Sequence, residues 1–133
     1  MDFSIIEKKV AAKWYLIDGT IVDEGEIGEA FAVLIRNATP GDLRRLSRKA
    51  KKSVFGGRRR AQVEDGDQLT KELLHHSVLD WRNLTQNIDG SGKVAMPCDR
   101  ANREKIDEMW TEFSQMWQAA ATGEFDEQEE LGN

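Results

Sequence analysis

The sequence predicts a predominantly helical α+β fold, in which a small N-terminal β-hairpin or short antiparallel sheet packs with three main helices. Two patterns support this class. β-prone runs rich in Val, Ile, Trp and Tyr lie before residue 37, and apolar residues recur at spacings of three and four in most of the remainder. A chain of 133 residues suits one hydrophobic core rather than two. We therefore expect one compact domain over residues 1–123 and a flexible acidic tail over 124–133.

The expected strands lie in the N-terminal third. Residues 13–17 include Trp, Tyr, Leu and Ile, and the Asp-Gly pair that follows is a turn signal. Residues 30–36 form a second β-prone run, and 20–22 are a candidate for a third short strand. The intervening acidic, Gly-containing segment is typical of a hairpin loop or an irregular connection.

The first main helix is expected over residues 40–52. Thr39 can cap the free backbone amides, Pro40 suits the first helical position, and Asp42 completes a capping-box spacing. Leu43, Leu46 and Ala50 line its apolar face. Residues 53–60 break this periodicity with two adjacent Gly and three Arg, which predicts a flexible loop.

The second main helix is expected to begin at Asp67 and to end at Trp81 or Leu84. Its apolar stripe contains Leu69, Leu73, Leu74, Val78, Trp81 and Leu84. An Asp-Gly-Ser-Gly turn follows at 89–92, and a third helix is expected over residues 100–121 with Gly123 as its stop. The Trp residues at 14, 81, 110 and 117 are the expected core anchors.

The third helix carries an aromatic and Met-rich face that has two interpretations. It is either part of the intramolecular core or a surface for another protein, since Trp and Met are favoured in adaptable interfaces. The apolar arc is wide enough for one part to pack in the core and another part to contact a second protein. The candidate partner-binding residues are Met109, Trp110, Phe113, Met116 and Trp117.

The net charge of −5 conceals a segregation of basic and acidic residues. Residues 44–60 contain no acid, and the chain after Lys105 contains no Lys or Arg. The basic segment is a solvated helix face, a partner for an acidic segment, or a phosphate-binding surface. The candidate basic surface consists of Arg44, Arg45, Arg48, Lys49, Lys52, Arg58, Arg59 and Arg60.

The residues with reactive side chains do not form a catalytic, cofactor or metal motif. Residues 87–98 resemble a calcium loop, but Cys98 stands where a bidentate carboxylate is needed. His75 and His76 are adjacent, so on a helix they point about 100° apart and do not share a metal. Cys98 has no evident general base beside it. We expect no enzyme activity, no cofactor and no bound metal.

The expected location is the cytoplasm. A single Cys excludes an internal disulfide and suits a reducing compartment. No apolar run approaches the roughly 20 residues that a membrane span needs, and the N-terminus lacks the pattern of a signal peptide. We expect no membrane partner.

One stretch of the sequence resembles a known family. Residues 78–81, Val-Leu-Asp-Trp, are followed by Asp89-Gly90, Pro97, Asp99 and Asn102. With the Trp-bearing strand at 13–15, the run Leu-Ile-Arg at 34–36 and the Pro-Gly-Asp helix start, the chain resembles the tail assembly chaperones of long-tailed bacteriophages and prophages over most of residues 8–121. In that pattern a helix ends in Val-x-x-Trp before an acidic turn and a capped helix.

The resemblance implies a non-enzymatic chaperone in the bacterial host cytoplasm that binds the tape-measure protein during tail morphogenesis and helps to recruit tail-tube subunits. Homo-oligomers are compatible with it, and a longer frameshifted product is often made in such families. Two alternatives remain open. One is a small nucleic-acid-binding phage protein that uses the basic segment 44–60, although the acidic tail and the shortage of aromatic residues there disfavour nucleic acid. The other is a structural tail-completion or head–tail joining protein.

Overall fold

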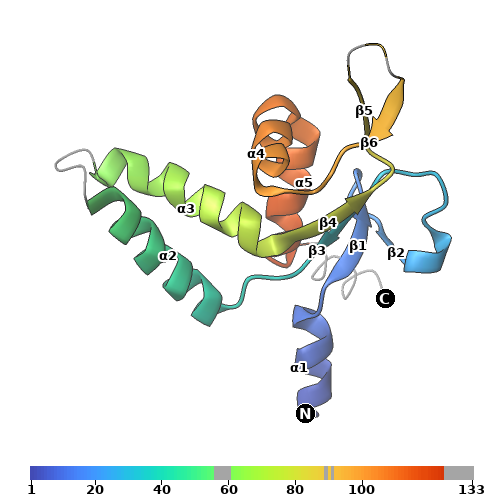
Figure 1. Cartoon of the computed structure of the whole chain (residues 1–133). Coiled ribbons are helices and arrows are strands. Elements are labelled where there is room, and N and C mark those ends of the chain that lie inside the picture. Colours follow the sequence, from blue (N-terminus) through green and yellow to red (C-terminus); the bar gives the residue numbers. More distant parts are fainter. Residues whose placement is uncertain (56–60, 89, 91, 125–133) are drawn as a thin grey trace.

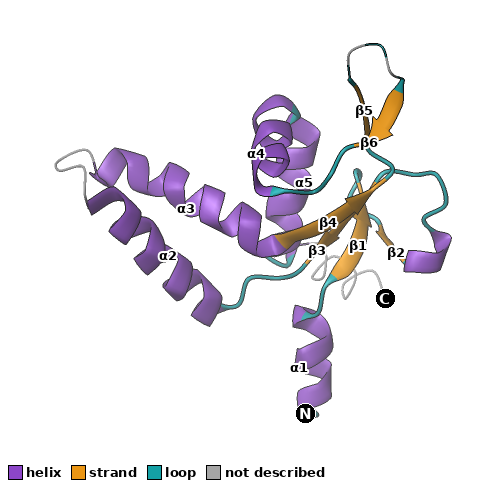
Figure 2. Ribbon diagram, viewed as in Figure 1, coloured by secondary structure: helices purple, strands orange, loops and turns teal. Residues whose placement is uncertain are grey.

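The computed structural model of the chain describes residues 1–55, 61–88, 90 and 92–124 and has the expected α+β fold (Figure 1). A small antiparallel sheet is covered on one face by the C-terminal helices, a helical hairpin extends away from it, and the N-terminal helix stands apart (Figure 2). The elements are α1 (Phe3–Val10), β1 (Lys13–Leu16), β2 (Ile21–Val22), the 3₁₀ helix η1 (Glu24–Glu26), β3 (Ala32–Ile35), α2 (Pro40–Phe55), α3 (Ala61–Ser77), β4 (Val78–Arg82), β5 (Thr85–Asn87), β6 (Lys93–Ala95), α4 (Arg100–Met109) and α5 (Thr111–Ala121).

The main sheet has four strands in the order β2-β1-β3-β4, and all neighbours are antiparallel. The strands predicted over 13–17, 20–22 and 30–36 are confirmed as β1, β2 and β3. In the pairing of β1 with β3, Tyr15 lies opposite Val33 and Trp14 opposite Leu34. Because side chains alternate between the faces of a strand, these two pairs point to opposite sides of the sheet.

The main core lies between α5 and one face of the sheet. Its centre contains Tyr15, Val33, Ile35, Leu74, Val78, Trp81, Phe113, Met116 and Trp117. Trp81 Nε1 donates a hydrogen bond to Met96 O at 2.7 Å, so the buried indole has a polar partner. A smaller cluster on the other face holds Trp14, Ile27 and Ala32, and the Arg82 guanidinium lies 4.7 Å from the Trp14 ring centroid.

The prediction that residues 67–81 form one helix is wrong at both ends. α3 begins at Ala61 and ends at Ser77, and Trp81 lies on strand β4. A β-bulge explains the misleading pattern. Val78 pairs with Ile35 and Trp81 with Val33, with a register shift between them, so two residues three apart both face the core. A bulged strand therefore mimicked helical spacing, and the expected helix ending in Val-x-x-Trp is a strand here.

The single helix predicted over 100–121 is also corrected, because the chain breaks at Trp110 into α4 and α5. Trp110 has φ −125° and ψ 100°, which is extended rather than helical backbone. The break allows Trp117 Nε1 to donate to Asp107 Oδ1 at 2.7 Å. In one straight helix these residues would lie about 15 Å apart along the axis, so this hydrogen bond requires the two segments to fold against each other.

The start of α2 is confirmed, including its capping box. Thr39 N donates to Asp42 Oδ2 at 3.0 Å, and Asp42 N donates to Thr39 Oγ1 at 3.1 Å. The helix extends to Phe55, so residues 53–55 belong to it rather than to the predicted loop. The remainder of that loop, 56–60, and the tail residues 125–133 lie outside the described residues. α2 and α3 pack side by side and extend from the sheet as a helical hairpin (Figure 1).

Candidate functional site

Helix α1 was not predicted from the sequence, although its start carries a recognisable signal. The Asp2 side chain accepts a hydrogen bond from Ser4 N at 3.0 Å and caps the helix. Phe3, Ile6 and Val10 follow at spacings of three and four, which places them on one side of the helix. An N-cap residue followed by this periodicity was the signal that could have identified α1.

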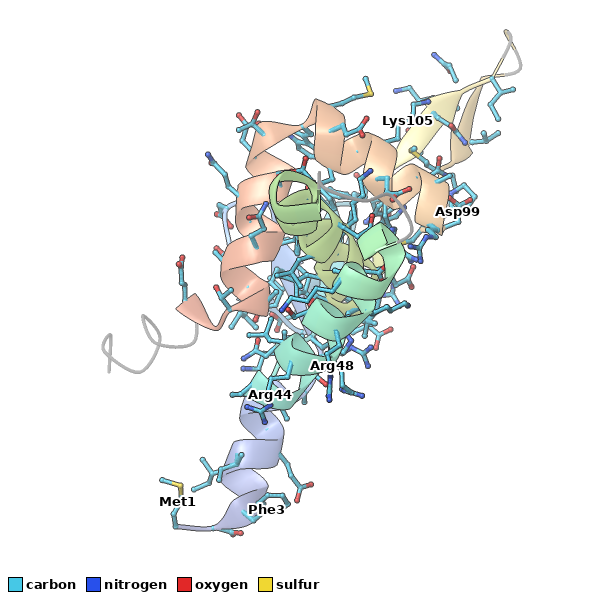
Figure 3. The ribbon with its side chains drawn as sticks, turned by 90° about the vertical axis from the view of Figure 1, so that its left-hand side faces the viewer. Met1, Phe3, Arg44, Arg48, Asp99 and Lys105 are labelled. Carbon is cyan, nitrogen blue, oxygen red and sulfur yellow. The ribbon has the colours of Figure 1, made fainter. Side chains whose placement is uncertain are left out.

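The apolar side chains of α1 are exposed to solvent. The exposed fractions are 67% for Phe3, 48% for Ile5, 44% for Ile6 and 38% for Val10. Figure 3 shows Phe3 and Met1 at the end of α1 that lies farthest from the rest of the fold. A helix of eight residues that packs so little of its apolar surface is marginally stable by itself, so α1 is suited to gain its packing from another molecule.

The structure places most of the partner-binding face predicted on residues 109–117 in the intramolecular core. Phe113 and Trp117 are fully buried and Met116 is 3% exposed, and all three lie in the core between α5 and the sheet. Trp110 is half-buried and stacks on Phe113, with ring centroids 6.2 Å apart. Only Met109, which is 74% exposed, stands free of this packing. The large apolar arc of the helix is explained by the sheet that it covers.

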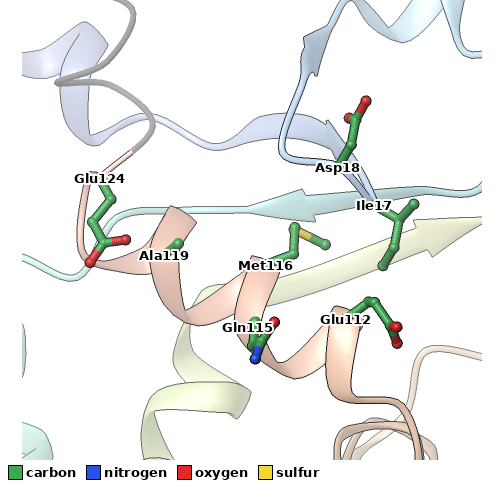
Figure 4. A pocket seen from close by; sticks show the side chains of 7 residues that line it. All are labelled: Ile17, Asp18, Glu112, Gln115, Met116, Ala119 and Glu124. Atoms are coloured by element: carbon green, nitrogen blue, oxygen red, sulfur yellow. The ribbon is translucent and has the colours of Figure 1, made fainter.

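A shallow open groove of about 340 Å³ lies between the end of β1 and α5 (Figure 4). Ile17, Met116 and Ala119 provide its apolar part, and Asp18, Glu112 and Glu124 provide carboxylates. These three negative charges make the groove unfavourable for phosphate or another anion. No sequence pattern identified it, because its residues come from segments about 100 positions apart that only the fold brings together.

The basic surface predicted on 44–60 is partly described. Four of its side chains are exposed on α2, namely Arg44, Arg45, Arg48 and Lys49. Figure 3 shows Arg44 and Arg48 on this helix. Arg45 is paired with Asp42, and Lys49 Nζ lies 3.2 Å from Glu72 Oε2. The side chain of Lys52 and residues Arg58, Arg59 and Arg60 lie outside what the structure describes.

The two histidines point to different elements, as their adjacency predicted. His76 Nε2 lies 3.2 Å from Asp42 Oδ2 on α2, and His75 Nε2 lies 3.3 Å from Glu104 Oε1 on α4. Burial lowers the pKa of both imidazoles, and nearby Arg charges act in the same direction. Both rings are therefore largely neutral at pH 7, and they join helices rather than share a ligand.

Cys98 is the remaining residue with a reactive side chain, and it lies in structural contacts. Burial raises the pKa of the half-buried Cys98 thiol, which disfavours the nucleophilic thiolate. Arg103 Nη1 donates to Cys98 O at 3.1 Å. Within the described part of the chain, no three or more His, Cys, Asp or Glu side chains form a cluster that could hold a metal ion. No described helix has the length and apolar character required to cross a membrane.

The fold and its surfaces define an α+β protein whose most exposed apolar element is its N-terminal helix. The sequence matches no protein-family model, and comparisons with curated proteins and with solved structures find no significant match.

Proposed function

We propose that this protein is a non-enzymatic tail assembly chaperone of a long-tailed bacteriophage, which binds apolar helical segments of the tape-measure protein in the bacterial cytoplasm. The observation that carries the proposal is the exposed apolar surface of α1, formed by Phe3, Ile5, Ile6 and Val10 together with Met1 just before the helix. The sequence resemblance described above supports the choice of client.

A chaperone of this kind must present apolar surface before its client arrives. Full burial of a Phe or Ile side chain is worth about 1.5–3 kcal/mol, so a few such contacts can hold an amphipathic client helix. The buried residues of α5 cannot supply these contacts without disrupting the core. We therefore assign client binding to α1 in place of the face at residues 109–117.

The proposal is tested by co-expression with overlapping fragments of a tape-measure protein, followed by co-purification at low and high salt. The variant Phe3→Ser/Ile6→Ser should lose capture of a helical fragment that the parent protein retains at high salt. The matched control is Ile88→Ser/Val94→Ser on the β5–β6 hairpin, where the two side chains are 47% and 39% exposed. The proposal is wrong if no fragment is captured or if both variants capture equally.

The same experiment separates the two alternatives. A nonspecific DNA control recovered only at low salt, with no fragment bound, would move the function to the basic surface on α2. The observation that favours this alternative is the exposure of Arg44 and Arg48. Recovery of the protein from purified virions would instead indicate a tail-completion or joining protein, since a chaperone leaves the finished particle.

A further inference from the structure

Two adjacent histidines in the last turn of α3 make contacts with neighbouring elements. The His76 side chain is 15% exposed and lies between two charged groups. Arg36 Nη2 lies 3.2 Å from His76 Nδ1, and Asp42 Oδ2 lies 3.2 Å from His76 Nε2. Arg36 Nε also donates a hydrogen bond to His76 O at 2.6 Å. These contacts connect the end of α3 to the segment after β3 and to the first turn of α2.

His75 repeats this arrangement against α4. Its side chain is 7% exposed. Arg103 Nε donates a hydrogen bond to His75 Nδ1 at 3.2 Å, and Glu104 Oε1 lies 3.3 Å from His75 Nε2. Arg103 Nη1 also donates to Cys98 O, just before α4. Each imidazole therefore lies between an arginine at Nδ1 and a carboxylate at Nε2.

The arginines fix the protonation state of both rings. A guanidinium group has N–H donors and no acceptor, so Nδ1 must be unprotonated where it faces one. The single proton of the neutral imidazole then lies on Nε2, toward the carboxylate. A second proton can add only to Nδ1, where the new N–H would face the N–H groups of the arginine. Protonation of either ring is therefore incompatible with its arginine contact.

The charges around each ring also oppose the imidazolium form. Each ring faces two guanidinium groups and one carboxylate, which are Arg36, Arg45 and Asp42 for His76 and Arg100, Arg103 and Glu104 for His75. Burial and the arginine charges outweigh the carboxylates and hold the pKa of both histidines below the ordinary value of 6.5. We propose that His75 and His76 form a pH-sensitive joint, in which uptake of protons on Nδ1 expels the two arginines and releases the starts of α2 and α4 from the end of α3.

Mild acid opens this histidine joint. Exposed rings in the opened form bind protons near the ordinary pKa of 6.5, whereas the closed form binds them only at lower pH. The stabilisation from the joint is therefore complete above about pH 7.5 and is lost as the pH falls through about 6.5 toward the lower pKa of the closed form. Neither histidine belongs to the main core, so the sheet and α5 keep their packing when the joint opens.

Nitrogen NMR of the imidazoles tests the protonation state directly, because the chain contains two histidines in all. At about pH 7.5 both Nδ1 atoms should have the chemical shift of an unprotonated nitrogen, and both rings should titrate below the ordinary pKa. The signal of Arg103 Nε–H, which is protected by its hydrogen bond to His75, should vanish as His75 titrates. A proton on Nδ1 of either ring at about pH 7.5 would overturn the proposal.

Single arginine variants separate the two rings. Arg103→Gln should raise the pKa of His75 by about 1 and change that of His76 much less, and Arg36→Gln should do the reverse. The matched control is Arg82→Gln, which removes an arginine that pairs with Glu24 instead, and it should change neither pKa. Similar changes in all three variants would reduce the effect to net charge and contradict the specific contacts.

Amide hydrogen exchange tests the opening itself. The amides of Leu43 and Arg103 donate hydrogen bonds in the first turns of α2 and α4. Between about pH 7.5 and 5.5 their protection factors should fall about tenfold more than that of Val33 in β3, since a pKa difference of about one unit between two states changes their equilibrium about tenfold. His75→Gln/His76→Gln, which removes both titrating rings, should abolish this difference.

Two outcomes of the exchange experiment would overturn the joint. An equal fall in protection at all three amides would show that acid destabilises the whole fold. Persistence of the difference in the double histidine variant would assign it to other groups. None of these measurements uses a tape-measure fragment, so failure here leaves the proposed function unaffected, and failure of capture leaves this proposal unaffected.

Discussion

Helices α1 and α5 have similar lengths and similar supplies of large apolar side chains, yet they lie in opposite environments. In α5, Phe113 and Trp117 are fully buried against the sheet. In α1, Phe3 and Ile6 remain 67% and 44% exposed. The comparison shows that an apolar stripe indicates which side of a helix favours burial. It does not indicate which surface, if any, buries that side.

The difference arises from what holds each helix in place. α5 is held near its middle by the hydrogen bond from Trp117 Nε1 to Asp107 and at its C-terminal end by the bond from Ala38 N to Ala121 O. α1 is stabilised by its own cap at Asp2 and lies beyond the start of β1, where no sheet face is available (Figure 1). The apolar stripe of α5 therefore builds the fold, and that of α1 remains exposed to solvent.

The largest expected effect comes from Trp117→Ala. Removing a fully buried indole leaves a cavity, so the variant should lose about 3–5 kcal/mol of unfolding free energy. Urea denaturation followed by circular dichroism measures this loss. A change below about 1 kcal/mol would place the core elsewhere and would reopen α5 as a partner surface.

An intermediate effect is expected at Asp42, which joins α2 to His76 at the edge of the core. Burial acts to raise its pKa, but hydrogen bonds from Thr39 and the charges of His76 and Arg45 outweigh burial and hold the pKa at about 2. Because this lies below the ordinary value of 3.8, the stabilisation is complete above about pH 4 and is lost as the pH falls to about 2.

Up to about 2 kcal/mol of unfolding free energy should disappear over that window. Asp42→Asn, which removes the titrating group, should flatten the pH dependence of urea midpoints between about pH 4 and 2. Equal slopes in the parent and the variant would show that other carboxylates dominate acid unfolding.

The smallest effect on stability is expected from Phe3→Ser/Ile6→Ser. Both side chains are largely exposed, so the unfolding free energy should change by no more than about 0.5 kcal/mol. Measured beside Trp117→Ala, this variant tests the comparison directly. A loss above about 2 kcal/mol would mean that α1 packs on the fold in solution, and it would weaken the assignment of client binding to this helix.

Local signals in the sequence predicted much of the fold. The capping box at Thr39 and Asp42, the cap at Asp99 and the strands around Tyr15 and Val33 were all predictable, because each depends on residues close in sequence. Helix α1 was missed although its own sequence carries a local signal, whereas the other failures occurred where a distant contact outweighed a local pattern. Val78 and Trp81 follow helical spacing, but pairing with β3 through a bulge makes them a strand.

Residue patterns alone were enough to predict the α+β class, the capping box that starts α2, the segregation of basic and acidic residues and the orientation of two adjacent histidines away from a shared ligand. The three-dimensional packing was needed to show which apolar helix is buried, that the chain breaks at Trp110, and that the end of α5 lies beside the start of α2. The physical reason is that propensity and capping act over one or two turns, whereas burial depends on which distant surfaces the fold brings into contact.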